Sequence, residues 1–517
     1  LNIIGDVTLI SVTPGQTRSE NNFFETSNCA SDWTAWIGQR IGQTSSDNPD
    51  GDAYDNLAEF AFAMPYDSGV GSQSLNGNTA WIIRPDTINP LLLEGVFVRP
   101  KGAPTNVTYT LQYAAAPGNP TAWTSLAISS SNLVAADNGD CTETVTIHDL
   151  EGITGLRDGK GIVRVKADLD EVPTTGIDHT SVTEVEGWKE TTFGLGCQTY
   201  NNPFLHETVF TGTVSSVVGQ SLGFTISAGN SDLPTIIGSG GSYYLEVTAG
   251  ANEGQRFDVV SATGATLTLA NDTVLDSLAA PFNTLTGAPP NSLVGASVVL
   301  RRHRTLDDVF LPTGFHASAS KSTADEVQVF SGGAWAIYWL YNGAGAARWV
   351  DAGNASMVDK GATVIPPGQG LFFNNRNTAD KVLAYGEVRP NDFMRPMGAG
   401  YNLVGGGYPI DQSATGTGGR ALSLGAGFFG SRDFKTADSF FVWNADATSG
   451  ASGYTTYYLL NGAPVSSSLI RWVKVGDAAA TSRGNELLLL GDRAVFQRAA
   501  SAMPVYYYPN PWTPGTP

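Results

Sequence analysis

The sequence predicts a mainly β, multidomain protein made of β-sandwiches or barrels, with one small helix–calcium loop–helix segment. Three observations support this fold class. Short runs of β-branched and aromatic residues recur between turns rich in Gly, Pro and Asn, which is the pattern of antiparallel strands. Charged residues make up only 15% of the chain and Gly accounts for 60 residues, a composition typical of secreted β-proteins. The length of 517 residues is enough for several domains.

Residues 1–26 are predicted to form a strand and a tether. Residues 2–12 are rich in Ile and Val, and the polar stretch that follows contains Pro14 and Gly15. Such a strand either pairs within its own chain or adds to the sheet of a neighbouring molecule by β-augmentation. Pairing within the chain is the default interpretation, whereas β-augmentation would link copies of the protein into a polymer.

Residues 27–70 are predicted to form two helices around an acidic, EF-hand-like loop. Over the twelve residues that begin at Asn48, oxygen-bearing side chains recur at the spacing of a calcium loop, and calcium takes about six to eight oxygen ligands. The predicted calcium ligands are Asn48, Asp50, Asp52, the backbone carbonyl of Tyr54, Asn56 and Glu59.

Two departures from the calcium pattern keep a plain polar surface loop as the alternative. Asn48 stands where Asp is usual, and Ala53 stands where the sharp turn favours Gly, because a Cβ makes a positive φ costly. The flanks favour calcium, since apolar residues recur at helical spacing over 33–41 and 57–64. The core expected between the two helices consists of Trp33, Trp36 and Phe60.

Two β units are predicted to follow this segment. Residues 71–185 read as a sandwich of roughly immunoglobulin type, and residues 186–305 as a small barrel or sandwich. Asn138-Gly139 lies between two alternating segments and is a strong signal of a hairpin with a two-residue turn. The clearest strands are expected at residues 81–84, 91–98, 106–113, 142–147, 161–166, 210–214, 243–247, 256–260 and 266–269.

One strongly basic stretch ends the second of these units, Arg301-Arg302-His303-Arg304. It could bind an anion. In an acidic chain such a stretch more often pairs with the protein's own carboxylates or lies at a subunit contact, and these interpretations stay open.

Residues 306–400 and 401–517 are predicted to be two copies of one β unit. Five short matches recur in the same order. They pair Thr323-Ala324-Asp325 with Thr436-Ala437-Asp438, Tyr341-Asn342-Gly343-Ala344 with Leu460-Asn461-Gly462-Ala463, Arg348-Trp349-Val350 with Arg471-Trp472-Val473, Gly368-Gln369-Gly370-Leu371 with Gly484-Asn485-Glu486-Leu487, and Arg376 with Arg493. The repeated tryptophans either fill the core of each copy, which is the default interpretation, or line a face that binds sugars.

Charge and hydropathy exclude several classes of partner. Lys and Arg total 29 residues against 48 for Asp and Glu, so the net charge is −19. This charge argues against nucleic acid and anionic membranes, which require a basic surface. No apolar run reaches about 18 residues, so no transmembrane helix is expected. The start at Leu1 suits a mature protein whose export signal has been removed.

Neither the cysteines nor any known motif indicates catalysis. Cys29, Cys141 and Cys197 lie far apart without metal-binding spacing, and we interpret them as small buried apolar residues, with one disulfide as the alternative. The chain lacks the G-x-S-x-G, P-loop and H-E-x-x-H motifs, so no catalytic or cofactor-binding residue is predicted apart from the calcium ligands. A carboxylate pair brought together only by the fold would leave no trace in the sequence.

Two stretches resemble known proteins. The segment Asn48-Pro49-Asp50-Gly51-Asp52 with Asn56-Leu57-Ala58-Glu59 resembles Asp-rich segments of secreted proteins of Verrucomicrobia and Planctomycetes. Residues from about 188 to 507 resemble an uncharacterised family of secreted β-rich proteins of Verrucomicrobia. The matching stretches are Asn202-Pro203-Phe204-Leu205, Phe210-Thr211-Gly212-Thr213-Val214, Gly254-Gln255-Arg256-Phe257, Thr305-Leu306-Asp307-Asp308-Val309-Phe310 and the two Arg-Trp repeats. The resemblance implies export and a β-rich fold, and it brings no activity.

Together these observations predict an extracellular or cell-surface protein that is not an enzyme. The leading expectation is a calcium-stabilised structural subunit of a filament or surface layer, which binds copies of itself through residues 2–12. The alternative belongs to a different class: a secreted carbohydrate-binding protein or polysaccharide-acting enzyme whose partners are surface glycans.

Overall fold

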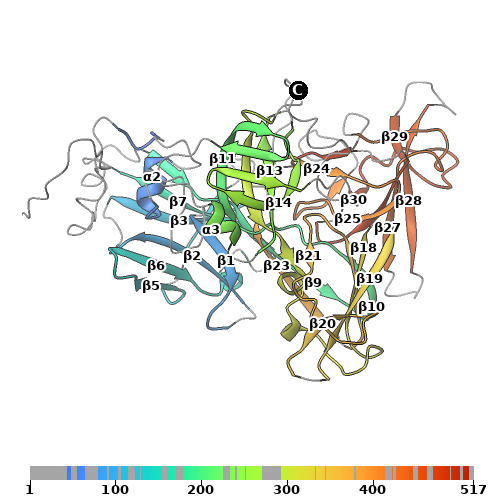
Figure 1. The fold of residues 1–517 in the computed structure, drawn as a ribbon, viewed down its shortest axis with the longest axis horizontal. Coiled ribbons are helices and arrows are strands. Elements are labelled where there is room, and N and C mark those ends of the chain that lie inside the picture. Colours follow the sequence, from blue (N-terminus) through green and yellow to red (C-terminus); the bar gives the residue numbers. More distant parts are fainter. Residues whose placement is uncertain are drawn as a thin grey trace, which may run out of the picture.

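The computed structural model consists mainly of antiparallel sheets, together with one closed barrel (Figure 1). The prediction of a mainly β, multidomain chain is therefore confirmed. An N-terminal sandwich, the barrel and two repeat units follow one another from blue to red across the figure. The structure describes residues 43–47, 55–64, 80–89, 92–102, 106–114, 123–128, 130–153, 156, 160–170, 179–224, 233–238, 241–250, 252–270, 293–331, 333–343, 345–377, 380–413, 422, 427–445, 452–462, 470–489, 491–500 and 505–511.

The N-terminal sandwich consists of two antiparallel sheets packed face to face. Its strands are β1 (Trp81–Pro85), β2 (Leu93–Pro100), β3 (Val107–Tyr113), β4 (Thr124–Leu126), β5 (Leu133–Asp137), β6 (Thr142–Ile147), β7 (Lys160–Leu169), β8 (His179–Val182), β9 (Glu186–Phe193) and β23 (Asp380–Glu387). One sheet has the order β1-β2-β6-β5, and the other has the order β23-β9-β7-β3-β4, with β8 also paired to β7. Apolar side chains of both sheets, among them Phe97, Val145, Val165 and Trp188, form one buried core.

Helix α2 (Asn56–Ala61) belongs to this sandwich. Leu57, Phe60 and Ala61 are buried in the sandwich core, and the Tyr109 hydroxyl of β3 donates to the Ala61 carbonyl at 2.7 Å. Phe60 therefore packs on the sheets. Trp33 and Trp36, its expected neighbours between two helices, lie outside the described residues.

The Asn138-Gly139 signal does mark a hairpin, the one between β5 and β6. Gly139 has a φ of 82°, a conformation that favours glycine. The predicted two-residue turn is wrong, because residues 138–141 connect the strands. Asn138 donates its N–H to the Thr142 carbonyl at 3.1 Å, and the Asp137 carboxylate accepts the Gly139 N–H at 2.9 Å.

A closed six-stranded barrel follows the sandwich along the chain. Its strands are β11 (Thr208–Val218), β12 (Ser221–Phe224), β13 (Tyr243–Ala249), β14 (Arg256–Thr263), β15 (Thr266–Leu269) and β16 (Ser297–Arg302). They pair in the order β11-β12-β15-β14-β13-β16, and β16 closes onto β11. The interior is apolar, with Phe210, Leu245, Phe257 and Leu300 at its centre, and the short helix α3 (Leu233–Gly238) lies beside β14.

Two repeat units form the rest of the described chain. The first contains β10 (Gly196–Tyr200), β17 (Arg304–Thr305), α4 (Leu306–Val309), the 3-10 turn η5 (Pro312–Gly314), β18 (Glu326–Ser331), β19 (Ala334–Tyr341), β20 (Arg348–Asp351), β21 (Val364–Ile365) and β22 (Leu371–Asn375). The second contains β24 (Phe393–Pro396), β25 (Gly400–Val404), β26 (Gln412–Ser413), β27 (Ser439–Ala445), β28 (Ser452–Asn461), β29 (Ile470–Lys474), β30 (Leu487–Leu489), β31 (Val495–Ala499) and β32 (Val505–Tyr508).

Strand order is the same in the two units. The main sheets are β10-β22-β18-β19-β20 and β25-β31-β27-β28-β29, and the small sheets β17-β21 and β26-β30 also correspond. In the same way the pair β9-β23 corresponds to β24-β32. The barrel is thus inserted into the first unit, between β10 and β17. Residues 186–200, which the sequence groups with the barrel, pair instead with β23 and β22 of that unit.

The repeated tryptophans occupy the same place in each unit. Trp349 is 0% exposed and its indole N–H donates to the Phe310 carbonyl at 2.8 Å, while Trp472 is 3% exposed and donates to the Leu422 carbonyl at 2.7 Å. Each ring lies within the apolar core of its own unit. These two tryptophans therefore follow the default interpretation and do not line a surface.

A buried aspartate also recurs, and it corrects part of the predicted alignment. Asp325 accepts the Arg376 N–H at 2.8 Å, and Asp438 accepts the Ala500 N–H at 2.7 Å. Arg376 is therefore equivalent to Ala500, and its predicted match with Arg493 is wrong. The match of residues 368–371 with 484–487 is wrong for a related reason. The first range leads into β22, whereas the second leads into β30, the counterpart of β21.

The two buried aspartates have different neighbours. Asp438 accepts a hydrogen bond from the Tyr506 hydroxyl at 2.9 Å. Beside Asp325 lies a second carboxylate, Asp380 of β23. Burial, and after it the Asp325 carboxylate, raises the pKa of Asp380 to about 6.

Two of the three cysteines lie within the described residues. The interpretation of all three cysteines as buried apolar residues is wrong, because Cys197 is exposed and free and Cys141 is disulfide-bonded. Cys29 lies outside the described residues. Within the described ranges, no helix is long and apolar enough to cross a membrane.

Candidate functional site

The predicted calcium segment is described only at its base. Asn48, Asp50, Asp52 and Tyr54 lie outside the described residues. The other two predicted ligands, Asn56 and Glu59, lie on α2, where their side chains are 0% and 1% exposed. Polar side chains at this depth require partners of their own.

Hydrogen bonds hold together the two ends of the chain that flank residues 48–54. Asn56 donates its backbone N–H to the Asp47 carbonyl at 2.9 Å, and Leu57 donates to the Ser45 carbonyl at 3.1 Å. The Asn56 Nδ2 donates to the Thr44 carbonyl at 2.7 Å. The Asn56 Oδ1 is buried, and among the described residues it has no hydrogen-bond partner. The two described ends that flank residues 48–54 are thus held together beside α2, where the Asn56 amide oxygen is a candidate ligand.

Asp55 fixes the start of α2 to the sandwich. One carboxylate oxygen accepts the Ala58 N–H at 2.8 Å, as a helix N-cap, and the Ser181 hydroxyl at 2.5 Å. The other oxygen lies 2.8 Å from the His179 Nε2. Both partners outside the helix are on β8, so the base of the predicted loop is anchored to a strand of the sheet.

A second polar cluster, Asp86, Glu94 and His148, was not anticipated from the sequence because its members are far apart in the chain. The His148 Nδ1 lies 3.1 Å from an Asp86 oxygen and 3.3 Å from a Glu94 oxygen. Within the described part of the chain, this is the one group of three or more His, Cys, Asp or Glu side chains close enough to share a metal ion.

The surroundings of this cluster favour a structural role. Glu94 accepts the Arg84 Nε at 2.8 Å and the Thr87 N–H at 3.1 Å, and Asp86 accepts the Ile88 N–H at 2.7 Å. Burial by itself raises the pKa of Asp86, but the N–H groups of Ile88 and its neighbours outweigh it and hold that pKa below its usual value. The N–H donors around these carboxylates already provide the positive charge density that a metal ion would supply.

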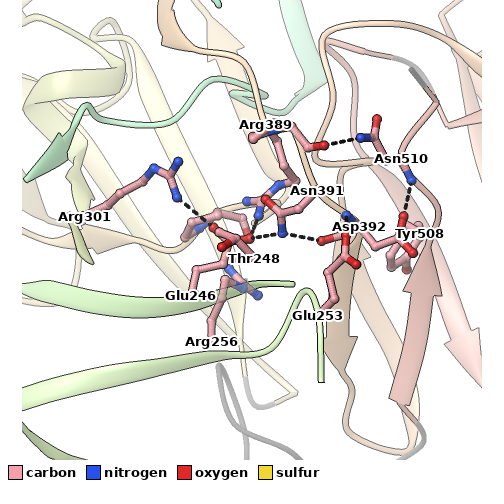
Figure 2. Close-up of polar contacts among 12 residues, drawn as sticks. Glu246, Thr248, Glu253, Arg256, Arg301, Arg389, Asn391, Asp392, Tyr508 and Asn510 are labelled. Carbon is pink, nitrogen blue, oxygen red and sulfur yellow. Dashed lines mark hydrogen bonds and ion pairs between the residues drawn. The ribbon is translucent and has the colours of Figure 1, made fainter. Parts of the chain in front are cut away.

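A buried ionic cluster lies where the barrel meets the repeat units (Figure 2). Arg301 of β16 pairs with Glu246 of β13, Nη1 to Oε2 at 3.2 Å, and with Glu387 of β23. Glu246 also pairs with Arg389. Arg301, Glu246 and Arg389 are each at most 1% exposed. Their charges are therefore compensated within the protein, as burial requires.

Further contacts extend this cluster to the second repeat unit. Asn391 donates to Glu246 at 3.2 Å, and the Asp392 N–H donates to Glu253 of the barrel at 2.9 Å. The Asp392 carboxylate in turn accepts the Asn510 N–H at 2.7 Å (Figure 2). The cluster thus joins the barrel to both repeat units.

The basic stretch at residues 301–304 supplies part of this junction. Arg302 pairs with Asp308 at 3.5 Å, and His303 pairs with Asp258 at 2.7 Å. Arg304 donates to backbone carbonyls, among them that of Leu205 at 2.9 Å. Arg302 and Arg304 also line a small pocket of about 20 Å³. Because these side chains already have protein partners, the contacts favour internal pairing over an anion site.

No protein-family model, curated protein or solved structure matches this chain. The resemblance to secreted Verrucomicrobia proteins therefore stays a prediction, and function has to be argued from the molecule.

Proposed function

We propose that this protein is a structural subunit of an extracellular filament or surface layer, which assembles with copies of itself and is stabilised by calcium. The observation that carries the proposal is the outer edge of β5. No strand among the described residues pairs with that edge, and β5 lies at the margin of the sandwich (Figure 1).

Among the described residues, the edge of β5 lacks the devices that usually prevent strand addition. Val134, Ala135 and Ala136 are all exposed, and Val134 is 48% exposed. The strand contains no Pro or Lys, and its one charged residue, Asp137, pairs with Lys101 at the strand's end. Natural proteins usually protect such an edge with charges, prolines, bulges or a covering segment. An unprotected aliphatic edge favours an added strand.

Two other edge strands, β29 and β20, carry such protection. β29 carries Arg471 and Lys474, and β20 ends in Asp351 and forms a bridge from Val350 to Asp359 on its outer side. The contrast suggests that β5 is an acceptor edge.

Residues 2–12 supply a matching donor in this proposal. They lie outside the described residues, and their Ile- and Val-rich sequence predicts a strand. An added strand would form several backbone hydrogen bonds with the five residues of β5, each contributing about 0.5–1.5 kcal/mol. Burial of Ile3, Val7 and Leu9 would add about 1.5–3 kcal/mol per side chain. A donor on one face and an acceptor on another give a head-to-tail contact that repeats without closing.

Two features support an exterior location and a role for calcium. The disulfide at Cys141 suits an oxidising compartment. The buried Asn56 Oδ1 is suited to bind a calcium ion together with the ligands predicted in residues 48–54. Calcium would also reduce the repulsion between subunits that each carry a charge of −19.

Negative-stain microscopy and light scattering of the purified protein with calcium test the proposal. Deleting residues 1–12 should abolish polymers and leave the melting profile of the remaining domains intact. Val134→Lys should also block assembly, because a lysine on an edge strand opposes pairing. The matched control is Val218→Lys, at a 75% exposed valine of β11, and it should assemble normally. Unchanged polymers from the deletion variant would refute the proposed link.

A further inference from the structure

A continuous band of aromatic rings crosses the two repeat units. We define this aromatic band as Phe330, Trp335, Phe372, Tyr401, Phe441, Trp443, Tyr454 and Phe496. Its strands β18, β19 and β22 belong to the first unit, and β25, β27, β28 and β31 belong to the second. The two main sheets stand next to each other in Figure 1.

Ring contacts run along the whole band. The Trp335 centroid lies 6.2 Å from that of Phe496, and Phe496 lies 5.9 Å from Tyr454. Tyr454 lies 4.8 Å from Trp443 and 6.5 Å from Phe441, which in turn lies 5.3 Å from Tyr401. These separations are those of rings in direct contact, so the band is one surface.

Much of the band is a duplicated feature. In the first unit Phe330 and Trp335 are register partners across β18 and β19, and in the second unit Trp443 and Tyr454 are register partners across β27 and β28. Each pair lies at the far end of its hairpin, beyond the recurrent aspartate that precedes the first strand. Aromatic rings therefore stand at equivalent sites in both units.

Exposure divides the band into a base and a rim. Phe372 is 7% exposed and packs with Leu403 and Ala494 between the two units. By contrast, Trp335 is 44%, Tyr454 42% and Tyr401 52% exposed. Packing of the two units explains the buried rings at the base and leaves the exposed rim unexplained. Exposed rings that adjoin one another in this way, rather than singly, are typical of a binding site.

The chemistry of the rim narrows the class of ligand. Its exposed rings are Trp and Tyr, which combine an apolar face with a hydrogen-bonding edge. The Trp443 indole N–H is buried, and within the described residues it has no acceptor. A ligand with flat C–H faces and hydroxyl edges would match both properties, and a sugar ring has both.

Charge excludes acidic ligands. All band residues are neutral, and the one charged register partner of a band residue is Arg498, opposite Tyr401. The Arg498 guanidinium is already bound to the Phe434 and Ala437 carbonyls. Because no described register partner of the band offers a free cation and the net charge is −19, we expect the protein to repel nucleic acids, anionic lipids and acidic glycans.

We propose that the aromatic band binds a neutral polysaccharide, with Trp335, Tyr454 and Tyr401 as stacking platforms. This inference does not rest on the assembly proposed above, because the band and β5 lie on different sheets. A subunit that bound glycan through the repeat units would still present β5 and residues 2–12 for contacts with its neighbours.

Sedimentation with insoluble cellulose, chitin and β-1,3-glucan, and affinity electrophoresis with their soluble fragments, test the inference in the full-length protein. Wild type should bind at least one neutral polymer and should not bind alginate, the acidic probe. Trp335→Ala and Tyr454→Ala should each weaken binding about tenfold or more, whereas Trp335→Tyr should retain most of it. The control is Phe429→Ala, which removes a 53% exposed ring outside the band and should bind like wild type.

Three outcomes would overturn the inference. The first is an absence of binding to every neutral polymer. The second is equal binding by the Trp335→Ala and Phe429→Ala variants, each confirmed as folded by its melting curve. The third is a Trp335→Ala variant that loses self-association without any change in glycan binding, which would identify the band as a contact between copies. Loss of polymers in the variant without residues 1–12, with glycan binding kept, would leave the inference standing.

Discussion

Replacing Arg301 by methionine should destabilise the junction between the barrel and the repeat units. Arg301 is 1% exposed and pairs with two carboxylates, of Glu246 and Glu387, that come from different parts of the fold. Glu246 would keep Arg389 and Asn391 as partners, whereas Glu387 would lose its buried cationic partner and keep the Thr208 hydroxyl, which donates to it at 2.9 Å. Removing one partner of a buried pair costs about 3–5 kcal/mol, because the remaining charge is left uncompensated.

The adjacent Arg302 is a matched control for this prediction. Its side chain is 45% exposed and lies 3.5 Å from the Asp308 carboxylate. Exposed pairs contribute about 0–1 kcal/mol, so Arg302→Met should change stability little. Differential scanning calorimetry is the suitable assay, since a multidomain chain need not unfold in one transition. The melting temperature of the barrel transition should fall in the Arg301→Met variant and stay unchanged in the Arg302→Met variant.

A double-mutant cycle then identifies the cause of the loss. Adding Glu387→Gln to Arg301→Met removes the stranded carboxylate, so the double variant should recover part of the lost stability, with a coupling energy of about 1–3 kcal/mol. Losses below about 1 kcal/mol for Arg301→Met, or equal losses for Arg301→Met and Arg302→Met, would refute the view that this cluster holds the barrel in place.

Three further predictions concern calcium, pH and the repeat cores. Calcium at about 100 times its dissociation constant should stabilise the wild type by about 2.7 kcal/mol. The Glu59→Gln variant should lose most of this gain, and the control Glu486→Gln should keep it. Melting curves recorded during EDTA titration test this, and a wild type that does not respond to EDTA would exclude the site. Because the pKa of Asp380 is raised to about 6, the folded protein holds a proton that the unfolded chain releases near pH 4, so the free energy of unfolding should fall between about pH 4 and 6. Asp380→Asn should remove that fall and raise the melting temperature at pH 7, and equal pH profiles would contradict the assignment. Trp349→Phe and Trp472→Phe should each lower the free energy of unfolding by about 1–3 kcal/mol, because each variant loses a buried hydrogen bond and ring volume. Markedly unequal losses, measured by urea unfolding, would argue against the equivalence of the two tryptophans.

Local signals in the sequence predicted strands well. The expected strands at residues 142–147 and 266–269 agree with β6 and β15 at both ends, and the one expected at 106–113 differs from β3 by one residue. These strands alternate clearly and end at turn residues, so their pattern is contained within a few positions. The alternation also indicates which face is buried.

Contacts between distant segments could not be predicted from the sequence. Glu246, Arg301 and Glu387 form one cluster but are separated by many residues, and no spacing rule connects them. The calcium ligands were predicted from a contiguous pattern, and the structure describes only Asn56 and Glu59 of that set. Repeat matching failed where loops differ in length: it compared the approach to β22 with the approach to β30 and so paired Arg376 with Arg493.

The way in which the barrel is inserted bears on how an assembled subunit would transmit force. The chain enters the barrel after Leu205 and leaves it before Arg304. Leu205 and Glu387 exchange backbone hydrogen bonds of 2.9 and 3.1 Å, and Arg304 donates to the Leu205 carbonyl at 2.9 Å. Both connections are therefore fixed to one point at the end of β23. That strand also belongs to a sheet of the sandwich, so β23 connects the sandwich with the point where the barrel is attached. If the proposed filament forms, force that enters the sandwich would reach the barrel connections through this strand. A buried ionic cluster adds little net stability, but its charges would lose their partners in any other orientation of the barrel, so the cluster favours this one orientation.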